Sequence, residues 1–196
     1  GVNGPWGGGV GGGPGGRARP PRPAMPRRRG LACGAGRWSI SGPERVELRL
    51  DPAAMDDAAD LLAWRNDPAT RARSRQGGEI DWDGHCRWLA AMIVRPDCLF
   101  LVARADGARC GTVRFARVAD GAVWEVSIAL APSWRGRGIG GRILRLGIER
   151  LRAAHPGAAI LAAAPGGNAA SAALFRRAGF APVPSDEEFE HYLLGA

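Results

Sequence analysis

A glycine-rich run, residues 135–141, has the residue types and spacing that most directly indicate chemistry. It reads Arg-Gly-Arg-Gly-Ile-Gly-Gly and lies between a strand-like stretch, residues 123–130, and a helix-like stretch, residues 139–152. Such a turn presents unpaired backbone N–H groups at the positive end of a helix dipole, and glycine lets an anion approach the backbone closely. Arg135 and Arg137 add charged donors that suit phosphate oxygens. The run therefore predicts a pyrophosphate-binding loop.

The same glycines also fit the dinucleotide fingerprint G-x-G-x-x-G, through Gly136, Gly138 and Gly141. That fold needs an acidic residue roughly 20 positions further on to hold the ribose. The next strand-like stretch, residues 158–164, runs into Ala-Ala-Ala-Pro without a carboxylate, and the run comes late in the chain. An ATP-type P-loop is excluded because the chain contains no lysine. The dinucleotide interpretation is therefore disfavoured.

A second block supports a different interpretation of the loop. Residues 168–180 read Asn-Ala-Ala-Ser-Ala-Ala-Leu-Phe-Arg-Arg-Ala-Gly-Phe. Together with Arg135-x-x-Gly138-x-Gly140, this block resembles two motifs of the GCN5-related N-acetyltransferase (GNAT) family, Gln/Arg-x-x-Gly-x-Gly/Ala and Asn-x-x-Ala/Ser-x-x-Leu-Tyr/Phe-x-x-x-Gly-Phe. The resemblance covers residues 46 to about 184. It implies an N-acetyltransferase that uses acetyl-CoA as co-substrate and needs no metal ion.

The implied fold is α/β (α+β): a mixed, mostly antiparallel central sheet flanked by helices on both faces, with the fourth strand splayed from the fifth. Hydrophobic periodicity and turn signals agree with that order. Asp51-Pro52 predicts the start of a helix that ends near residues 66–68, and Asp106-Gly107 predicts a hairpin turn. The other expected elements are strands 46–50, 98–103, 110–118, 123–130, 158–164, 179–183 and 189–194, and helices 82–94, 139–152 and 168–177.

The resemblance assigns co-substrate contacts to three parts of the chain. The splayed strand offers backbone N–H groups, the glycine-rich loop holds the pyrophosphate, and the late block flanks the pantetheine arm. The residues concerned are Ile128, Ala129, Leu130, Arg135, Gly136, Arg137, Gly138, Ile139, Gly140, Gly141, Asn168, Ser171 and Phe175. Many family members carry a tyrosine at the position of Phe175 to protonate the departing thiolate. Phenylalanine cannot donate a proton, so either water or another group protonates the thiolate, or the thiolate leaves as an anion.

Two residues are candidates for the general base that removes the amine proton. Glu125 lies on the strand before the loop, where related acetyltransferases often carry a glutamate. A partly apolar cleft beside Trp124 would make its carboxylate a stronger base, whereas a strand-edge salt bridge is the structural alternative. His85 lies on helix 82–94, one turn from Trp88, and histidine titrates near neutral pH. A lone histidine on a helix more often packs or caps.

The N-terminal half carries the residues that could recognise the acceptor amine. The segment Trp64-Arg65-Asn66-Asp67-Pro68, with Arg71 and Arg114, resembles a subgroup of the family that acts on nucleotide-linked amino sugars of surface polysaccharides. Arg65, Asn66, Arg71 and Arg114 would then bind the acceptor, the arginines through its phosphates. The structural alternative is core packing for Trp64 and solvent exposure for the arginines. A peptide α-amine, a small amine and a non-catalytic acyl-CoA-binding module remain open.

Residues 1–45 differ in composition from the rest of the chain. They hold 14 of the 30 glycines and 7 of the 15 prolines, which predicts a disordered segment and leaves residues 46–196 as a single N-acetyltransferase domain. Their eight arginines and one acid, Glu44, contribute +7 of the formal net charge of +8. A nucleic-acid partner for the domain is therefore not expected. The lack of a first methionine and of lysine favours a segment translated from upstream of the true start.

Cysteine spacing and hydropathy indicate whether a metal ion or a membrane is an expected partner of the chain. Cys33, Cys86, Cys98 and Cys110 show no paired metal-ligand spacing, which favours free thiols in a reducing cytoplasm. No stretch is apolar enough to span a membrane, and a secretory signal is not expected. We expect a cytoplasmic monomer or homodimer whose partners are acetyl-CoA and a small-molecule amine.

Overall fold

The computed structural model describes residues 46–72, 74, 77–118 and 122–196. The segment predicted to be disordered, residues 1–45, lies outside this described part. The elements are β1 (Leu48–Pro52), a 3-10 turn (Met55–Asp57), α1 (Ala58–Arg65), α2 (Pro68–Arg71), α3 (Trp82–Ile93), β2 (Cys98–Ala105), β3 (Ala108–Arg117), β4 (Val123–Leu130), a second 3-10 turn (Pro132–Trp134), α4 (Ile139–Ala154), β5 (Ala159–Pro165), α5 (Ala169–Arg177), β6 (Ala181–Val183) and β7 (Phe189–Leu194).

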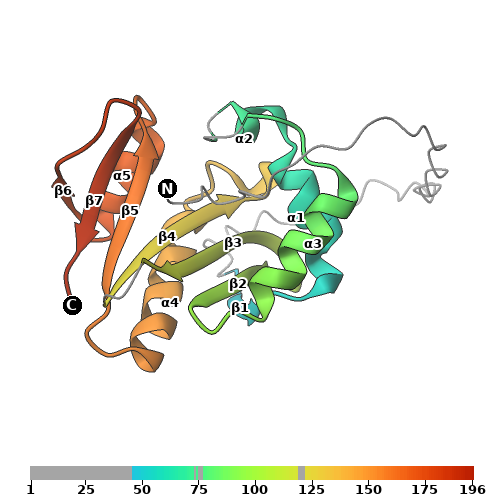
Figure 1. Ribbon diagram of the computed structural model, residues 1–196, viewed down its shortest axis with the longest axis horizontal. Helices are drawn as coiled ribbons and strands as arrows, with labels where there is room; N and C mark the ends of the chain where they lie inside the picture. Colours follow the sequence, from blue (N-terminus) through green and yellow to red (C-terminus); the bar gives the residue numbers. More distant parts are fainter. Residues whose placement is uncertain (1–45, 73, 75–76, 119–121) are drawn as a thin grey trace, which may run out of the picture. The chain divides into compact units, whose positions relative to one another are not determined.

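Seven strands form one sheet in the order β1-β2-β3-β4-β5-β7-β6 (Figure 1). Every neighbouring pair is antiparallel except β4 and β5, which run parallel. A parallel pair needs a crossover connection, and α4 supplies it between these two strands. The predicted mixed, mostly antiparallel sheet is therefore confirmed.

Helices cover both faces of the sheet, because successive strand residues point to opposite faces and each face has its own apolar core. Val113 of β3 belongs to the core that includes Ile143 of α4. Val102 of β2 belongs to a second core, which includes Leu61 of α1 and Leu89 of α3. Figure 1 shows α1 and α3 together beside the β1–β3 end of the sheet. The prediction of helices on both faces is confirmed.

The pairing between β4 and β5 stops halfway along β4. Residues 123–126 pair with residues 159–162 of β5. Residues 127–130 continue to pair with β3 on the other side, while the second half of β5 pairs with β7. The two strands consequently diverge, as Figure 1 shows. The predicted splay of the fourth strand from the fifth is confirmed.

The start of the first helix differs from the prediction. Asp51 and Pro52 end strand β1, where they pair with Val102 and Leu101 of β2. Proline is tolerated there because β1 is an edge strand of the sheet. The chain becomes helical only at Met55.

Helix α2 is absent from the prediction. The sequence Asn-Asp-Pro was interpreted as a helix stop, yet Pro68 occupies the first position of a new helix, where its missing N–H costs nothing. The Asp67 carboxylate caps that helix by accepting a hydrogen bond from the Ala69 N–H at 3.2 Å. A proline that ends one helix can therefore begin the next.

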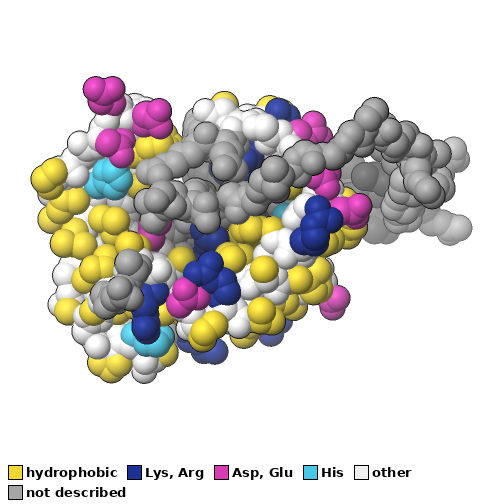
Figure 2. Space-filling view, in the orientation of Figure 1, with side chains coloured by type: hydrophobic (Ala, Val, Ile, Leu, Met, Phe, Trp, Pro, Cys, Tyr) yellow, Lys and Arg dark blue, Asp and Glu magenta, His cyan; other side chains and the backbone are white. Residues whose placement is uncertain are grey.

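Asp57 is a buried carboxylate that joins three parts of the fold. Basic and acidic side chains lie interspersed at the surface on the face shown in Figure 2. Asp57, in contrast, is a buried charged residue, since it is only 1% exposed. It accepts hydrogen bonds from the Ala54 N–H at 2.9 Å, from Arg109 Nε at 2.5 Å and from an Arg104 guanidinium nitrogen at 3.2 Å. The carboxylate therefore links the start of α1 to β2 and β3.

We expect Asp57→Asn to lower the free energy of unfolding by about 3 kcal/mol or more, because removal of one partner leaves a buried ion cluster uncompensated. Asp60→Asn is the matched control: Asp60 also contacts Arg109, at 3.2 Å, but its side chain is 47% exposed. Its replacement should cost at most about 1 kcal/mol. Urea denaturation of both variants measures the difference, and equal losses would contradict a special role for Asp57.

Candidate active site

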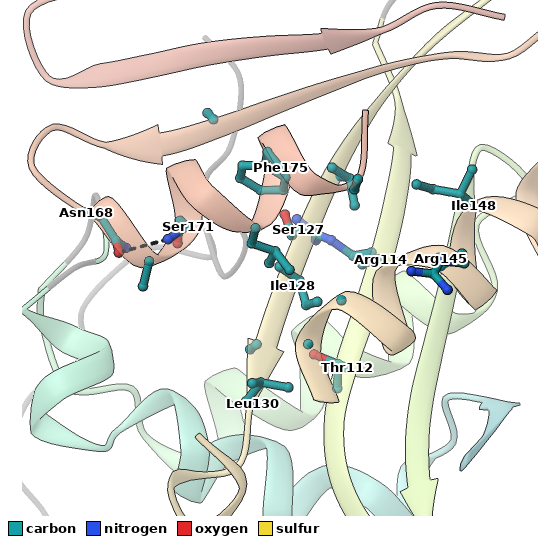
Figure 3. Close-up of a pocket in the computed structure, with 18 of the residues that line it drawn as sticks. Thr112, Arg114, Ser127, Ile128, Leu130, Arg145, Ile148, Asn168, Ser171 and Phe175 are labelled. Carbon is teal, nitrogen blue, oxygen red and sulfur yellow. Dashed lines mark hydrogen bonds between the residues drawn. The ribbon is translucent and has the colours of Figure 1, made fainter. Parts of the chain in front are cut away.

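The divergence of β4 and β5 opens into a cavity of about 1100 Å³. The second half of β4, the glycine-rich loop, α4 and α5 contribute to its wall (Figure 3). All but two of the residues that the family resemblance assigns to the co-substrate line it: Ile128, Ala129, Leu130, Arg135, Gly136, Gly138, Gly140, Gly141, Asn168, Ser171 and Phe175. The fold thus brings the three predicted parts of the chain to one space.

The two exceptions, Arg137 and Ile139, turn their side chains away from the cavity. The Arg137 guanidinium lies 5.1 Å from the centre of the Trp134 ring, and Ile139 is buried in the core beneath α4. Because the loop faces the cavity with its backbone, these residues could contribute N–H groups there but not side chains. The assignment of both residues to the co-substrate stays a prediction.

The loop has the geometry of an anion site. Gly136 and Gly138 have φ angles of 75° and 73°, in the left-handed region that glycine adopts without strain. A Cβ at either position would meet no atom within 4 Å, so it would project into open space. Gly138 is also the N-cap of α4, a 16-residue helix whose first N–H groups lack intrahelical partners. An oxyanion at this point would meet unpaired donors and the positive end of the helix dipole.

Arg135 ties the loop to α2. Its guanidinium donates to the two Asp67 carboxylate oxygens at 3.1 and 3.3 Å and to Thr70 Oγ1 at 2.7 Å. The sequence predicted a charged donor for phosphate, and Arg135 does line the cavity. Its charge is nevertheless already shared with a carboxylate, so its larger effect is to position the loop. Asp67 and Thr70 were not predicted for this role, because the contact spans 68 positions of the chain.

Three arginines that the sequence interpretation missed also line the cavity. Arg145 and Arg152 lie on α4, and Arg177 ends α5. Figure 3 shows Arg145 on α4, at the edge of the cavity. A helical residue four positions after Gly141 lies on the same face one turn on, so Arg145 could have been found from spacing. Glu149 of α4 also lines this side, so the three arginines leave it with an excess of positive charge.

Phe175 lies in the wall of the cavity and has two aromatic neighbours. Its ring centre is 5.5 Å from that of Phe180 and 5.9 Å from that of Tyr192. The Tyr192 hydroxyl donates to Glu190 and accepts from Arg176 at 3.3 Å, and the bond to Glu190 raises the pKa of Tyr192. Tyr192 does not line the cavity. The only tyrosine of the chain therefore does not replace the phenol that Phe175 lacks.

Glu125 lines the cavity from β4. It lies on the same face as Ser127, which pairs with Arg114 of β3. Trp124, its expected apolar neighbour, points to the opposite face because adjacent strand residues alternate; its ring stacks against His155 with centres 4.6 Å apart. The Arg114 cation on β3 lies close enough to interact electrostatically with Glu125.

His85, the second candidate base, is not brought to the cavity. It is 1% exposed, and its ring stacks on Trp88 with centres 5.7 Å apart. Burial lowers the pKa of His85, partly opposed by the Ala58 backbone. A neutral packed histidine is the outcome that the structural alternative described, which leaves Glu125 as the candidate base.

Of the four residues predicted to bind the acceptor, Arg114 alone lines the cavity. Arg65 is 1% exposed on α1. Asn66 donates to the Ile80 carbonyl at 2.8 Å and accepts from the Ile80 N–H at 3.0 Å. Arg71 donates through Nε to the Gly77 carbonyl at 2.9 Å. Asn66 and Arg71 thus bind the backbone of the segment after α1. A role for Arg65, Asn66 and Arg71 in binding the acceptor stays a prediction, to which the lining of the cavity adds no support.

The fold is a mixed α/β sheet that opens between two parallel strands over a glycine-rich loop with the geometry of an anion site. The family follows from a comparison of the sequence with family models, in which the acetyltransferase (GNAT) domain matches residues 47–181. The chain belongs to this family of acetyltransferases. The resemblance drawn from the two sequence motifs is thereby confirmed.

Solved structures share the fold. One is yncA from Salmonella typhimurium, described with its cofactor acetyl-CoA, at 22% identity and a TM-score of 0.64 over 76% of this chain and 94% of that one. Another is a ribosomal-protein-alanine N-acetyltransferase from Brucella melitensis, at 23% identity and 0.64 over 76% and 99%. A third is the N-acetyltransferase PseH from Campylobacter jejuni, at 14% identity and 0.59 over 76% and 97%. The curated proteins gave no match.

The described part of the chain offers neither a metal site nor a membrane-spanning helix. Within residues 46–72, 74, 77–118 and 122–196, no group of three or more His, Cys, Asp or Glu side chains is placed to hold a metal ion. None of the helices in that part combines the length and the apolar character needed to cross a membrane.

Proposed function

We propose that this chain transfers the acetyl group of acetyl-CoA to the primary amine of a small molecule. The observation that carries the proposal is the cavity between β4 and β5, with the loop of Gly136 and Gly138 at one end and Glu125 inside it. The loop fits the pyrophosphate because Gly136 and Gly138 carry no side chain, and the space that a Cβ would occupy at each position is open. The edge of β4 that β5 leaves unpaired fits the extended pantetheine arm.

The reaction needs positioning, proton removal and stabilisation of an oxyanion. The amine nitrogen attacks the thioester carbonyl carbon, a C–N bond forms and the C–S bond breaks. Glu125 accepts the proton that the nitrogen loses, and backbone N–H groups of residues 128–130 would stabilise the oxyanion. The CoA thiolate leaves and takes a proton from water, because neither Phe175 nor Tyr192 offers one in the cavity.

A nucleotide-linked amino sugar is one of the proposed acceptors. It is supported by the resemblance of residues 64–68 to the subgroup that acts on such sugars, and by Arg114 in the cavity wall. Arg65 and Arg71 give it no support, since neither lines the cavity. A peptide α-amine is the second candidate for the acceptor. A non-catalytic acyl-CoA-binding module would bind the same co-substrate without turnover.

Titration calorimetry and a thiol-release assay test this proposal on the full chain. Acetyl-CoA should bind in the low-micromolar to sub-millimolar range usual for such sites, and NADH should show no saturable binding. A panel of amines, including nucleotide amino sugars, should then release CoA. Tight NADH binding without CoA binding would refute the proposal, and CoA binding without release by any amine would favour the non-catalytic module.

A further inference from the structure

Arg114 is a buried cation in the wall of the cavity. It lies on β3, is 9% exposed and lines the cavity. Figure 3 shows Arg114 beside Ser127, its partner on β4. Its guanidinium donates to Met92 Sδ at 3.6 Å and lies 5.8 Å from the centre of the Trp88 ring. A thioether sulfur is a weak acceptor and a ring face is an incomplete counter-charge.

Other arginines of the fold show what Arg114 lacks. Arg104 and Arg109 share the Asp57 carboxylate, and Arg135 is paired with Asp67, although all three are more exposed than Arg114. Arg114 donates instead to the Met92 thioether, and the Glu125 carboxylate attracts it electrostatically across the strand pair. Burial lowers the pKa of its guanidinium. Desolvation outweighs this attraction, so the buried charge is only partly balanced, and an anion in the cavity would relieve the remaining cost.

The position of Arg114 relative to Glu125 indicates where such an anion would belong on the acceptor. Arg114 pairs directly with Ser127, so Glu125 is its diagonal neighbour on the same face of the sheet. Diagonal neighbours on antiparallel strands have Cα atoms about 7–8 Å apart. Other charged or titratable groups near Arg114 are Cys98 of β2 and Arg95, which follows α3. One side of the cavity therefore presents a cation and a carboxylate a short distance apart.

We propose that Arg114 binds a carboxylate or phosphate of the acceptor while Glu125 receives the amine, so that the acceptor is an amine with an anionic group within a few bonds of its nitrogen. This inference rests on the proposed acetyl transfer. A free amino acid and an amino sugar phosphate both satisfy it. A peptide α-amine does not, because amidation removes the carboxylate next to its nitrogen.

Matched pairs of amines test the inference on the unmodified full chain. Each pair keeps the amine and removes the anion: alanine and alaninamide for carboxylate, and glucosamine 6-phosphate and glucosamine for phosphate. We expect kcat/KM for the anionic member of at least one pair to exceed that for the neutral member by about thirtyfold or more, as for a buried charge pair. The pair that shows the preference identifies which anion is recognised.

Variants then assign the preference to Arg114. Arg114→Gln should abolish the preference and leave the KM for acetyl-CoA within about twofold of the wild-type value, whereas Arg114→Lys should keep part of it. Arg117→Gln is the matched control on the same strand, since Arg117 is exposed and does not line the cavity. It should leave the preference unchanged. Melting temperatures of all three variants show whether a loss reflects unfolding.

The outcomes separate this inference from the proposed function. Equal transfer to the anionic and neutral members of both pairs would overturn the inference and leave acetyl transfer standing. A preference that survives in a folded Arg114→Gln protein would also overturn it. Acetyl-CoA binding without transfer to any amine would refute the proposed function, and the inference with it.

Discussion

Replacement of Glu125 by glutamine is expected to lower kcat by about a hundredfold or more, the usual contribution of a general base, while acetyl-CoA binding persists. Glutamine keeps the size of the side chain and its hydrogen-bonding capacity but cannot accept the amine proton. Glu125 lies in the cavity wall on the face of β4 that carries Ser127. Steady-state kinetics with the preferred amine measure the loss, and calorimetry with acetyl-CoA measures the retained binding.

The pH dependence gives a second readout for Glu125. A base must be deprotonated to act, so the wild-type rate should fall as pH falls through its titration. Glu125→Gln should lose this acidic limb. A variant that retains near-wild-type turnover with the limb intact would show that another group removes the proton.

His85→Gln is the control for the base assignment. His85 is buried beside Trp88 and does not line the cavity, so its replacement should affect stability more than kcat. A large loss of kcat in a folded His85→Gln protein, with Glu125→Gln still active, would reverse the assignment. If both variants stay active, positioning carries most of the rate enhancement.

Gly138→Val is expected to weaken acetyl-CoA binding by about a hundredfold, because a side chain in the phosphate cradle removes charge-assisted hydrogen bonds worth roughly 1.5–3 kcal/mol each. Gly138 has a φ of 73°, and its Cβ would project into the open space of the cavity. Valine there combines backbone strain with a steric block. Calorimetry with acetyl-CoA measures the change in affinity.

Gly107→Val is the control that separates the effect of backbone strain from the effect of a steric block in the glycine-rich loop. Gly107 lies in the turn between β2 and β3, has a φ of 82°, and a Cβ there would also meet no atom within 4 Å. It does not line the cavity. This variant should lose stability but keep acetyl-CoA affinity, and a similar loss of affinity in both variants would contradict a specific role for the loop.

Local signals predicted most of the fold. Strand Val123–Leu130 has the predicted bounds because its apolar run is framed by turn residues. The predicted turn at Asp106-Gly107 is confirmed, with positive φ at both positions. The end of β1 and the whole of α2 were missed, because an Asp-Pro or Asn-Asp-Pro sequence can end a strand, end a helix or begin one. Tertiary pairing decides among these outcomes.

The same distinction between local signals and long-range packing applies to the candidate site. The glycine-rich loop and the Asn168 block are contiguous motifs, and the sequence placed both at the cavity. Arg65, Arg71 and His85 were assigned from residue type, but the direction of each side chain depends on packing against distant residues. The contact of Arg135 with Asp67 spans 68 positions and has no local signal. Residue type therefore predicts what chemistry a side chain can perform, and the fold decides whether that side chain reaches the cavity.

The divergence of β4 from β5 leaves an edge of the sheet inside the molecule, along residues 127–130. Exposed strand edges recruit other extended chains, and proteins commonly guard them with charges, prolines or bulges. Here α4, α5 and the loop surround the edge, since all three line the cavity. The walls that shape the opening therefore also cover an unpaired strand edge, which limits its association with strands of other proteins.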